Sequence, residues 1–171
     1  MALINTTTTG VLGSTFYGDG TGSLTVQQNG VTLGVFGNQP AFSAYPNAQQ
    51  TLSSSTITKI LFQTEEFDTN NNFASSRFTP TVAGYYQIQG KIQPEDAYSA
   101  GAIAIYKNGS NYKWGSYNIN ASGVASPSMS CLVYCNGSTD YIEFYASVVT
   151  GQNLNSTSVF TWFQGCMLRS A

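Results

Sequence analysis

The sequence lacks histidine altogether and contains few charged residues of either sign. Charged residues make up 8% of the 171 positions, whereas about 25% is usual for soluble domains. Without histidine, catalytic triads that use this side chain as a base are excluded. The formal net charge is −2 and no cluster of Lys and Arg occurs, so we expect no nucleic-acid partner.

Long apolar runs are also absent, because no stretch approaches the ~20 residues that a membrane-spanning helix needs. We therefore expect no membrane partner. The opening "MALINTTTTG" has neither the basic nor the apolar region of a secretory signal. Disorder is not expected either, since 42% hydrophobic and 13% aromatic residues are sufficient to form a core.

Cysteine is scarce as well, with Cys131, Cys135 and Cys166 alone. An odd number without an export signal favours free thiols. Cys131 and Cys135 share one strand face in "SMSCLVYC", where a small apolar side chain suits a core. We expect both to be buried and unreactive. The spacing fits no common set of zinc ligands, so we expect no metal and no cofactor.

What the sequence does contain is a succession of short runs rich in Val, Ile, Phe, Tyr and Thr, separated by Gly and Asn. No window has the helical spacing of apolar residues. "SLTVQQNGVTLGVF" and "GAIAIYKNGSNYKW" each contain an Asn-Gly pair, which is typical of a two-residue hairpin turn. Many short strands at fairly regular spacing predict an all-β sandwich or barrel.

The segment "SVFTWFQGCML", from Ser158 to Leu168, reads as one strand with two apolar faces. Successive side chains of a strand alternate, so one face carries Val159, Phe163 and Met167, and the other carries Phe160, Trp162, Cys166 and Leu168. An exposed row of this kind usually marks an interface. We predict that neighbouring subunits cover the second face. The alternative is cover by a helix or by the N-terminal arm of the same subunit.

The first residues differ from the rest, because residues 1–22 are rich in Thr and Gly and residues 23–36 predict a hairpin. One interpretation is a flexible leader. The other is an arm for attachment to a partner, which would bury Leu3, Ile4, Val11, Leu12, Phe16 and Tyr17. We assign residues 1–39 to this arm and hairpin, and residues 40–171 to the main domain.

Four stretches occur in a specific order: "PAFSAY" (Pro40–Tyr45), "RFTPTVAGYYQI" (Arg77–Ile88), "AIAIYKNG" (Ala102–Gly109) and "STSVFTWFQGCML" (Ser156–Leu168). Together they resemble the globular head of complement subcomponent C-one-q, a relative of tumour necrosis factor. The resemblance implies a ten-stranded, two-sheet jelly roll that assembles as a compact homotrimer, with the terminal strand in the inner sheet. It implies a trimer interface that contains Phe42, Tyr45, Tyr85, Tyr86, Phe160 and Trp162.

The eight acidic residues form no recognisable catalytic pair. Glu65, Glu66 and Asp68 cluster in "QTEEFDTNNN", which lacks the spaced ligands of an EF-hand loop. Solvated loop acids are the expected state. Because a glycosidase needs two carboxylates at a fixed separation across a cleft, we predict that the protein is not an enzyme.

The stretch "KNGSNYKWGSYNINASG" places Tyr112, Trp114 and Tyr117 among Asn, Ser and Gly. Aromatic side chains with adaptable polar neighbours suit recognition surfaces, so these three residues are candidates for contacts with host-surface glycans. The alternative is that they pack on the sheet, as aromatic residues of strands usually do.

Low charge, a polar composition, a trimeric jelly roll and the missing export signal together predict a bacteriophage virion structural protein, assembled in the host cytoplasm and exposed on the particle. Jelly-roll trimers that resemble this family occur among phage virion proteins. No shaft repeat is present, which favours a capsid decoration (cement) protein or a short knob. It would be attached through residues 1–39 to other virion proteins such as the major capsid protein. The alternative is an adhesin, a glycan-recognising receptor-binding tip module of a tail or head fibre.

Overall fold

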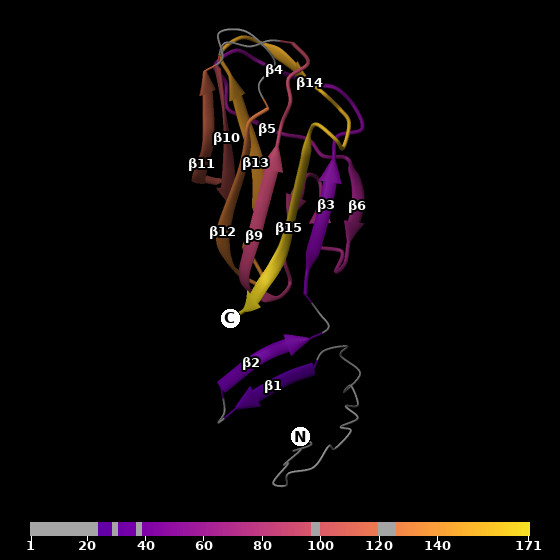
Figure 1. Ribbon diagram of the computed structural model, residues 1–171, viewed down its shortest axis with the longest axis vertical. Coiled ribbons are helices and arrows are strands. Elements are labelled where there is room, and N and C mark those ends of the chain that lie inside the picture. The colour runs from indigo at the N-terminus through magenta and orange to yellow at the C-terminus, as the bar shows by residue number, and fades with distance from the viewer. Residues whose placement is uncertain (1–23, 29–30, 37–38, 97–99, 120–125) are drawn as a thin grey trace. The chain divides into compact units, whose positions relative to one another are not determined.

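The computed structural model describes residues 24–28, 31–36, 39–96, 100–119 and 126–171 (Figure 1). These residues form fifteen strands and no helix, which confirms the predicted all-β fold. The chain divides into two compact units, Met1–Gly37 and Asn38–Ala171. In the described part of the chain, no helical segment has the length and hydropathy that a membrane crossing requires.

The first unit contains the hairpin that the sequence predicts. Strands β1 (Leu24–Gln28) and β2 (Val31–Phe36) pair antiparallel, with Gln28 opposite Val31. The register shifts between Val26 and Gln27. The Asn-Gly turn and the six predicted attachment residues, Leu3, Ile4, Val11, Leu12, Phe16 and Tyr17, lie outside the described residues.

The second unit is a sandwich of two antiparallel sheets, which lie one behind the other in Figure 1. The first sheet has five strands in the order β12 (Ser128–Asn136), β9 (Ala83–Lys91), β15 (Trp162–Ser170), β3 (Ala41–Tyr45) and β6 (Thr64–Asp68). Strand β9 alternates between exposed or half-buried and fully buried residues. This alternation is typical of a sheet with one face on a core.

The second sheet has the order β11 (Ser110–Ile119), β10 (Ala100–Lys107), β13 (Ile142–Val148), β8 (Arg77–Phe78) and β7 (Phe73–Ala74). Strand β5 (Thr58–Lys59) also pairs with β13. Two further short strands, β4 (Gln50–Leu52) and β14 (Gln152–Leu154), pair with each other. The second unit has thirteen strands in its described residues, five of them only two or three residues long, so the predicted count of ten strands is not reproduced.

The core lies between the two sheets and is built around phenylalanine rings. Phe42 of β3 stacks on Phe73 and Phe78, with ring centroids 4.9 and 4.4 Å apart. Phe163 of β15 lies edge-on to Phe42 at 5.0 Å and 5.6 Å from Phe144 of β13. Full burial of one such ring contributes about 1.5–3 kcal/mol. Rings from strands that are distant in sequence therefore hold the two sheets together.

The hairpin between β10 and β11 confirms the second predicted Asn-Gly turn. Lys107 and Ser110 are opposite each other across it. Asn108 and Gly109 both have positive φ angles, 53° and 75°, as this type of two-residue turn requires. The turn also positions Lys107, whose side chain reaches strand β12 of the other sheet.

Strand β12 is an edge strand, since among the strands that the structure describes only β9 pairs with it in the first sheet. Two of its carbonyl oxygens accept hydrogen bonds from side chains of the β10–β11 hairpin. Lys107 Nζ donates to Tyr134 O at 2.7 Å, and Tyr112 Oη donates to Leu132 O at 3.3 Å. Side chains thus occupy positions that a further strand would need.

Candidate functional site

The outer face of the five-stranded sheet carries neutral side chains over most of its area. We call it the amide face and define it by Tyr85, Gln87, Gln89, Leu132, Tyr134, Trp162, Gln164, Cys166 and Leu168. The register sets Gln89 opposite Gln164, and Gln87 opposite both Leu132 and Cys166. Alternate residues of β9, β12 and β15 point to this face because their neighbours fill the core.

Glutamine side chains cross the centre of the amide face as a ladder of hydrogen bonds. Gln164 Nε2 donates to Gln89 Oε1 at 2.8 Å, and Gln87 Nε2 donates to Ser130 Oγ. Each amide retains further donor and acceptor capacity. The centre of the face is therefore polar without being charged, whereas Lys91 opposite Trp162 and Arg169 opposite Tyr85 place cations toward its two ends. A second surface of the same kind can approach this centre without burying an ion.

Large apolar side chains flank this ladder. Leu168 is 54% exposed and Tyr85 is 48% exposed, and both lie near the C-terminal end of β15. Tyr85 packs against Tyr134 of β12, with ring centroids 5.5 Å apart. Leu132 is exposed on the same face. Apolar side chains grouped in this way usually mark a contact surface.

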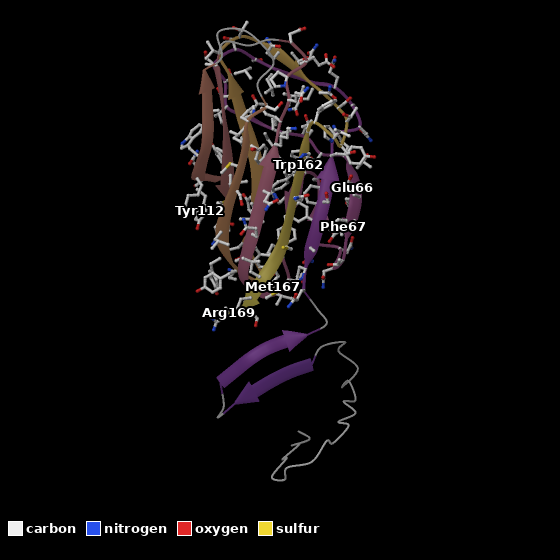
Figure 2. The ribbon with its side chains drawn as sticks, in the orientation of Figure 1. Glu66, Phe67, Tyr112, Trp162, Met167 and Arg169 are labelled. Carbon is white, nitrogen blue, oxygen red and sulfur yellow. The ribbon has the colours of Figure 1, made fainter. Side chains whose placement is uncertain are left out.

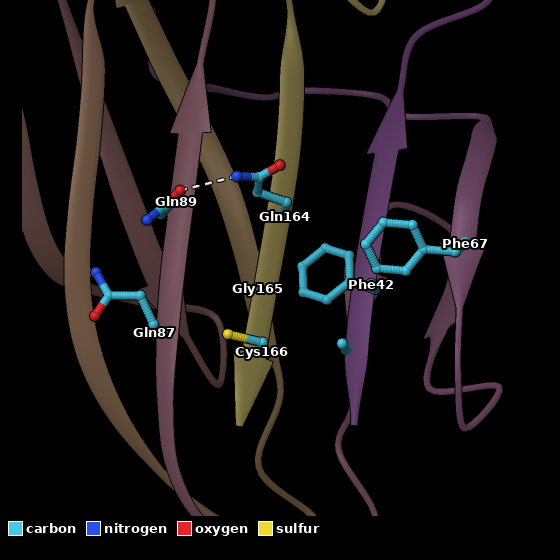
Figure 3. Close-up of a pocket in the computed structure, with 8 residues that line it drawn as sticks. Phe42, Phe67, Gln87, Gln89, Gln164, Gly165 and Cys166 are labelled. Carbon is cyan, nitrogen blue, oxygen red and sulfur yellow. Dashed lines mark hydrogen bonds between the residues drawn. The ribbon is translucent and has the colours of Figure 1, made fainter. Parts of the chain in front are cut away.

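A pocket of about 270 Å³ is hollowed into the amide face between β9, β15, β3 and β6 (Figure 3). Gln87, Gln89, Gln164 and Cys166 line it together with the exposed ring of Phe67, which comes from β6. The remaining lining residues are Ala41, Phe42 and Gly165. The pocket is thus a neutral recess in a neutral face.

Two of the six predicted interface residues lie in the core instead of on a surface. Phe42 and Tyr86 are 0% exposed in the single chain, so neither has surface left to contact a neighbour. Phe42 fills the ring stack described above. Tyr86 donates a hydrogen bond from its Oη to Val82 O at 2.6 Å, and its burial raises the pKa of its phenol well above the usual value.

The other four predicted residues keep accessible surface. Tyr85 is the exposed tyrosine of its pair, while Tyr45 and Trp162 are half-buried. Phe160 is exposed but precedes the strand, because the terminal strand starts at Trp162 and not at Ser158. The segment before it is a turn in which the N–H groups of Phe160 and Thr161 donate to Thr157 O.

The outer face of the six-stranded sheet has a different composition. We call it the aromatic face and define it by Lys59, Arg77, Tyr106, Trp114, Tyr141, Glu143 and Tyr145. The register aligns Trp114, Ala104, Tyr145 and Lys59 in one row across four strands. The rings of Tyr106 and Tyr145 stack at 3.9 Å with an interplanar angle of 24°.

A buried carboxylate organises the charges of the aromatic face. Glu143 Oε1 accepts from Lys59 Nζ at 2.7 Å and forms an ion pair with Arg77 at 2.9 Å. Burial raises the pKa of Glu143, but the hydrogen bonds and charges of Lys59 and Arg77 outweigh this effect, so its pKa lies below the usual value. The Arg77 guanidinium also lies over the ring of Tyr141, 3.8 Å from its centroid.

The three predicted glycan residues have different surroundings. Trp114 is 58% exposed and belongs to the aromatic face. Tyr112 is also exposed, but its hydroxyl caps the edge of β12 (Figure 2). Tyr117 belongs to β11 by its backbone, and its side chain lies outside the described residues. The sequence did not identify Lys59, Arg77, Tyr106 or Tyr145, because strand order alone brings them together.

The three thiols are free, and their burial differs. Cys135 is buried in the core, which raises the pKa of its thiol to about 12. Cys131 is half-buried rather than fully buried as predicted, and burial also raises its pKa. Cys166 is exposed at the pocket of the amide face. The reactivity of Cys166 therefore shows whether another molecule covers that face.

The predicted cluster of loop acids is part of a strand. Glu65, Glu66 and Asp68 belong to β6, at the edge of the first sheet. Glu66 accepts a hydrogen bond from Ser43 Oγ at 2.7 Å, and Asp68 accepts from the N–H of Phe73 at 2.7 Å. Among the described residues, no three His, Cys, Asp or Glu side chains are grouped as a metal ion would require.

No protein-family model and no curated protein matches the sequence. Solved structures do match the fold. The globular domain of zebrafish complement 1qA protein aligns with a TM-score of 0.62 and 16% identity, over 77% of this chain and 99% of that chain. Murine APRIL aligns with a TM-score of 0.61 and 11% identity, over 77% and 100%. The TNF protein Eiger from S. frugiperda gives 0.61 and 8%, over 78% and 94%. The main unit therefore has the jelly-roll fold of tumour-necrosis-factor-like and complement globular-head domains.

Proposed function

We propose that this protein is a homotrimeric structural protein of a bacteriophage particle, in which the amide face of each subunit contacts its neighbours. The observation that supports the self-association in this proposal is the amide face itself. It combines exposed Leu168, Tyr85 and Leu132 with a ladder of uncharged glutamines. A lone subunit in water would leave this apolar area exposed, whereas closed cyclic assembly covers it.

The physical argument for self-association rests on desolvation. Burying a charged side chain at an interface costs several kcal/mol unless it is well paired, and the centre of this face carries amides and apolar groups instead. Amides can exchange hydrogen bonds with their equivalents on a neighbouring copy. The resemblance to complement globular heads implies three copies around one axis.

In this proposal residues 1–39 attach each trimer to other virion proteins, such as the major capsid protein. The protein then acts as a capsid decoration (cement) protein or as a short knob. A trimer that binds only the mature shell stabilises it, because a ligand specific for one state shifts the equilibrium toward that state.

Light scattering of the purified full chain tests the assembly. We expect three times the mass of one 18.3 kDa chain. A monomer mass would overturn the proposal. Copy number in purified virions tests the role: hundreds of copies indicate decoration, three to a few dozen indicate a fibre tip, and absence from the particle contradicts both.

Thiol labelling tests which surface is buried in the trimer. Cys166 is exposed in the subunit, so we expect it to be protected in the native trimer and reactive after dissociation by mild urea. Cys166→Ser identifies the responding thiol. A trimer in which Cys166 reacts like a free thiol would place the interface elsewhere.

A second candidate function is favoured by the exposure of Trp114, a large aromatic ring with 58% of its surface free. In this alternative the protein is a glycan-recognising tip of a tail or head fibre. Glycan-array binding that Trp114→Ala abolishes, while the oligomer stays intact, would support it. Binding that is unaffected by this substitution would contradict it.

A further inference from the structure

The aromatic face contains a combination of groups that packing alone does not require. The stacked rings of Tyr106 and Tyr145 lie beside Ala104, and Trp114 stands on the other side of this small residue. Two strand spacings separate Trp114 from Tyr145, which is about 10 Å. Two aromatic surfaces at this distance match the length of a disaccharide.

The charges next to these rings do not balance. Lys59 and Arg77 both pair with the single carboxylate of Glu143, so the group carries one positive charge in excess. The Arg77 side chain is 43% exposed, and its Nε and one terminal nitrogen are directed at Glu143. The guanidinium lies over the ring of Tyr141, and its exposed fraction leaves donors that a carboxylate from solvent can reach.

We propose that the aromatic face binds an oligosaccharide that ends in an acidic sugar. The sugar carboxylate pairs with Arg77, the acidic ring lies beside Tyr145, and the next ring reaches Trp114. Lys59 adds its charge from behind, because its Nζ already donates to Glu143 Oε1 and to Ser75 O. Glu143 holds both cations in place and does not itself contact the ligand. The inference rests on the second candidate function, whose ligand class it specifies, and it is independent of the trimer.

The excess charge is what selects this ligand over a neutral glycan. A neutral sugar would use the rings but would leave the guanidinium without a counter-charge, whereas a carboxylate gains a charge-assisted hydrogen bond. Because the site lies at the surface, this attraction falls as salt is added. Stacking on the rings is much less sensitive to salt.

Titration of the full chain with 3′-sialyllactose and with lactose, followed by NMR, compares an acidic sugar with its neutral parent. We expect binding of the acidic ligand, at least about tenfold tighter than binding of lactose. The difference should shrink when salt is raised from 50 to ~500 mM. A glucuronate-terminated disaccharide serves as a second acidic probe.

Three variants assign the contacts. Trp114→Ala should weaken binding of both ligands about tenfold, as expected for removal of a large aromatic contact. Arg77→Gln should remove the preference for the acidic ligand. Val159→Ala, at a 70% exposed position outside both faces, is the matched control and should leave binding unchanged. Should Arg77→Gln fail to fold, the salt titration and Arg77→Lys, which keeps the charge but loses the fork, decide in its place.

The outcomes separate this inference from the function on which it rests. Equal, salt-independent binding of both sugars that Trp114→Ala abolishes would overturn the acidic ligand and leave glycan recognition standing. Failure of every acidic and neutral probe to bind would overturn both. Neither result bears on the trimer, which has its own test.

Discussion

The two outer faces of the sandwich share one core but differ in how they use charge. The amide face has Gln89 and Gln164 at its centre, joined by a neutral hydrogen bond. The aromatic face has the buried Glu143 at its centre, joined to two cations. The chain has only six Lys and Arg residues, so two of them on one carboxylate is a strong concentration of charge.

This difference shows what each face can contact. The neutral centre of the amide face loses little free energy when water is removed from it, so it suits a large, permanent contact with another copy. A face with an unbalanced, partly exposed cation retains a specific attraction for anions and suits a small polar ligand. The low overall charge of the sequence therefore does not mean that every surface is neutral.

The largest expected effect comes from breaking the core that both faces share. Phe163→Ala removes a ring that contacts both sheets, and we expect a loss of about 3–5 kcal/mol in the free energy of unfolding. Urea denaturation with intrinsic fluorescence measures it. Val159→Ala, at a 70% exposed position before β15, is the control and should change stability little. A loss below 1 kcal/mol for Phe163→Ala would contradict the packing described here.

The next effect distinguishes the faces. Glu143→Ala leaves Lys59 and Arg77 without their carboxylate, and we expect a loss of about 3 kcal/mol, the lower end for a buried pair because both cations retain contact with water. Gln164→Ala on the amide face removes one neutral hydrogen bond and should cost about 1 kcal/mol. If urea denaturation gave equal losses in the free energy of unfolding for the two variants, the two faces would not differ in how they use charge.

Acid should weaken the aromatic face specifically. The pKa of Glu143 is lower in the folded chain than the ordinary value of 4.5, so its contribution to stability is complete above that value and is lost as pH falls through the folded pKa. Melting temperatures between pH 7 and pH 3 measure this loss. In Glu143→Gln the decline should be shallower, and an identical decline in both proteins would contradict the assignment.

The smallest expected change in subunit stability concerns the edge of the amide face. Leu168→Asp places a charge on an exposed position, so the free energy of unfolding of the subunit should change by about 0.5 kcal/mol or less. The same charge should prevent burial against another copy and shift the oligomer toward monomer in light scattering. An oligomer that is unaffected would show that Leu168 lies outside the interface.

Local signals in the sequence predicted the strands and turns well. The Asn108-Gly109 turn was predictable because few other residue pairs adopt two positive φ angles easily. The alternation in the terminal strand correctly separated Phe163 and Met167, which are buried, from Trp162, Cys166 and Leu168. The start of that strand was wrong, since the turn at Thr157 depends on hydrogen bonds that composition does not reveal.

The composition of the two faces was less predictable because it depends on strand order. Lys59 and Arg77 are 84 and 66 residues from Glu143 in sequence. They meet because their strands, β5 and β8, both pair with β13, which carries Glu143. One signal was present: Glu143 is an acid inside the apolar run "YIEFYASVV". A buried acid requires partners, although the sequence does not say which cations supply them.

The side chains that bond to the edge of β12 have a consequence for the protein at high local concentration. Backbone groups at an open sheet margin are templates for strand addition, the route by which crowded β-proteins form fibrils. Lys107 and Tyr112 occupy the carbonyls of Tyr134 and Leu132, so this margin is closed to strand addition at those positions. Many copies can then stand side by side without polymerising through it.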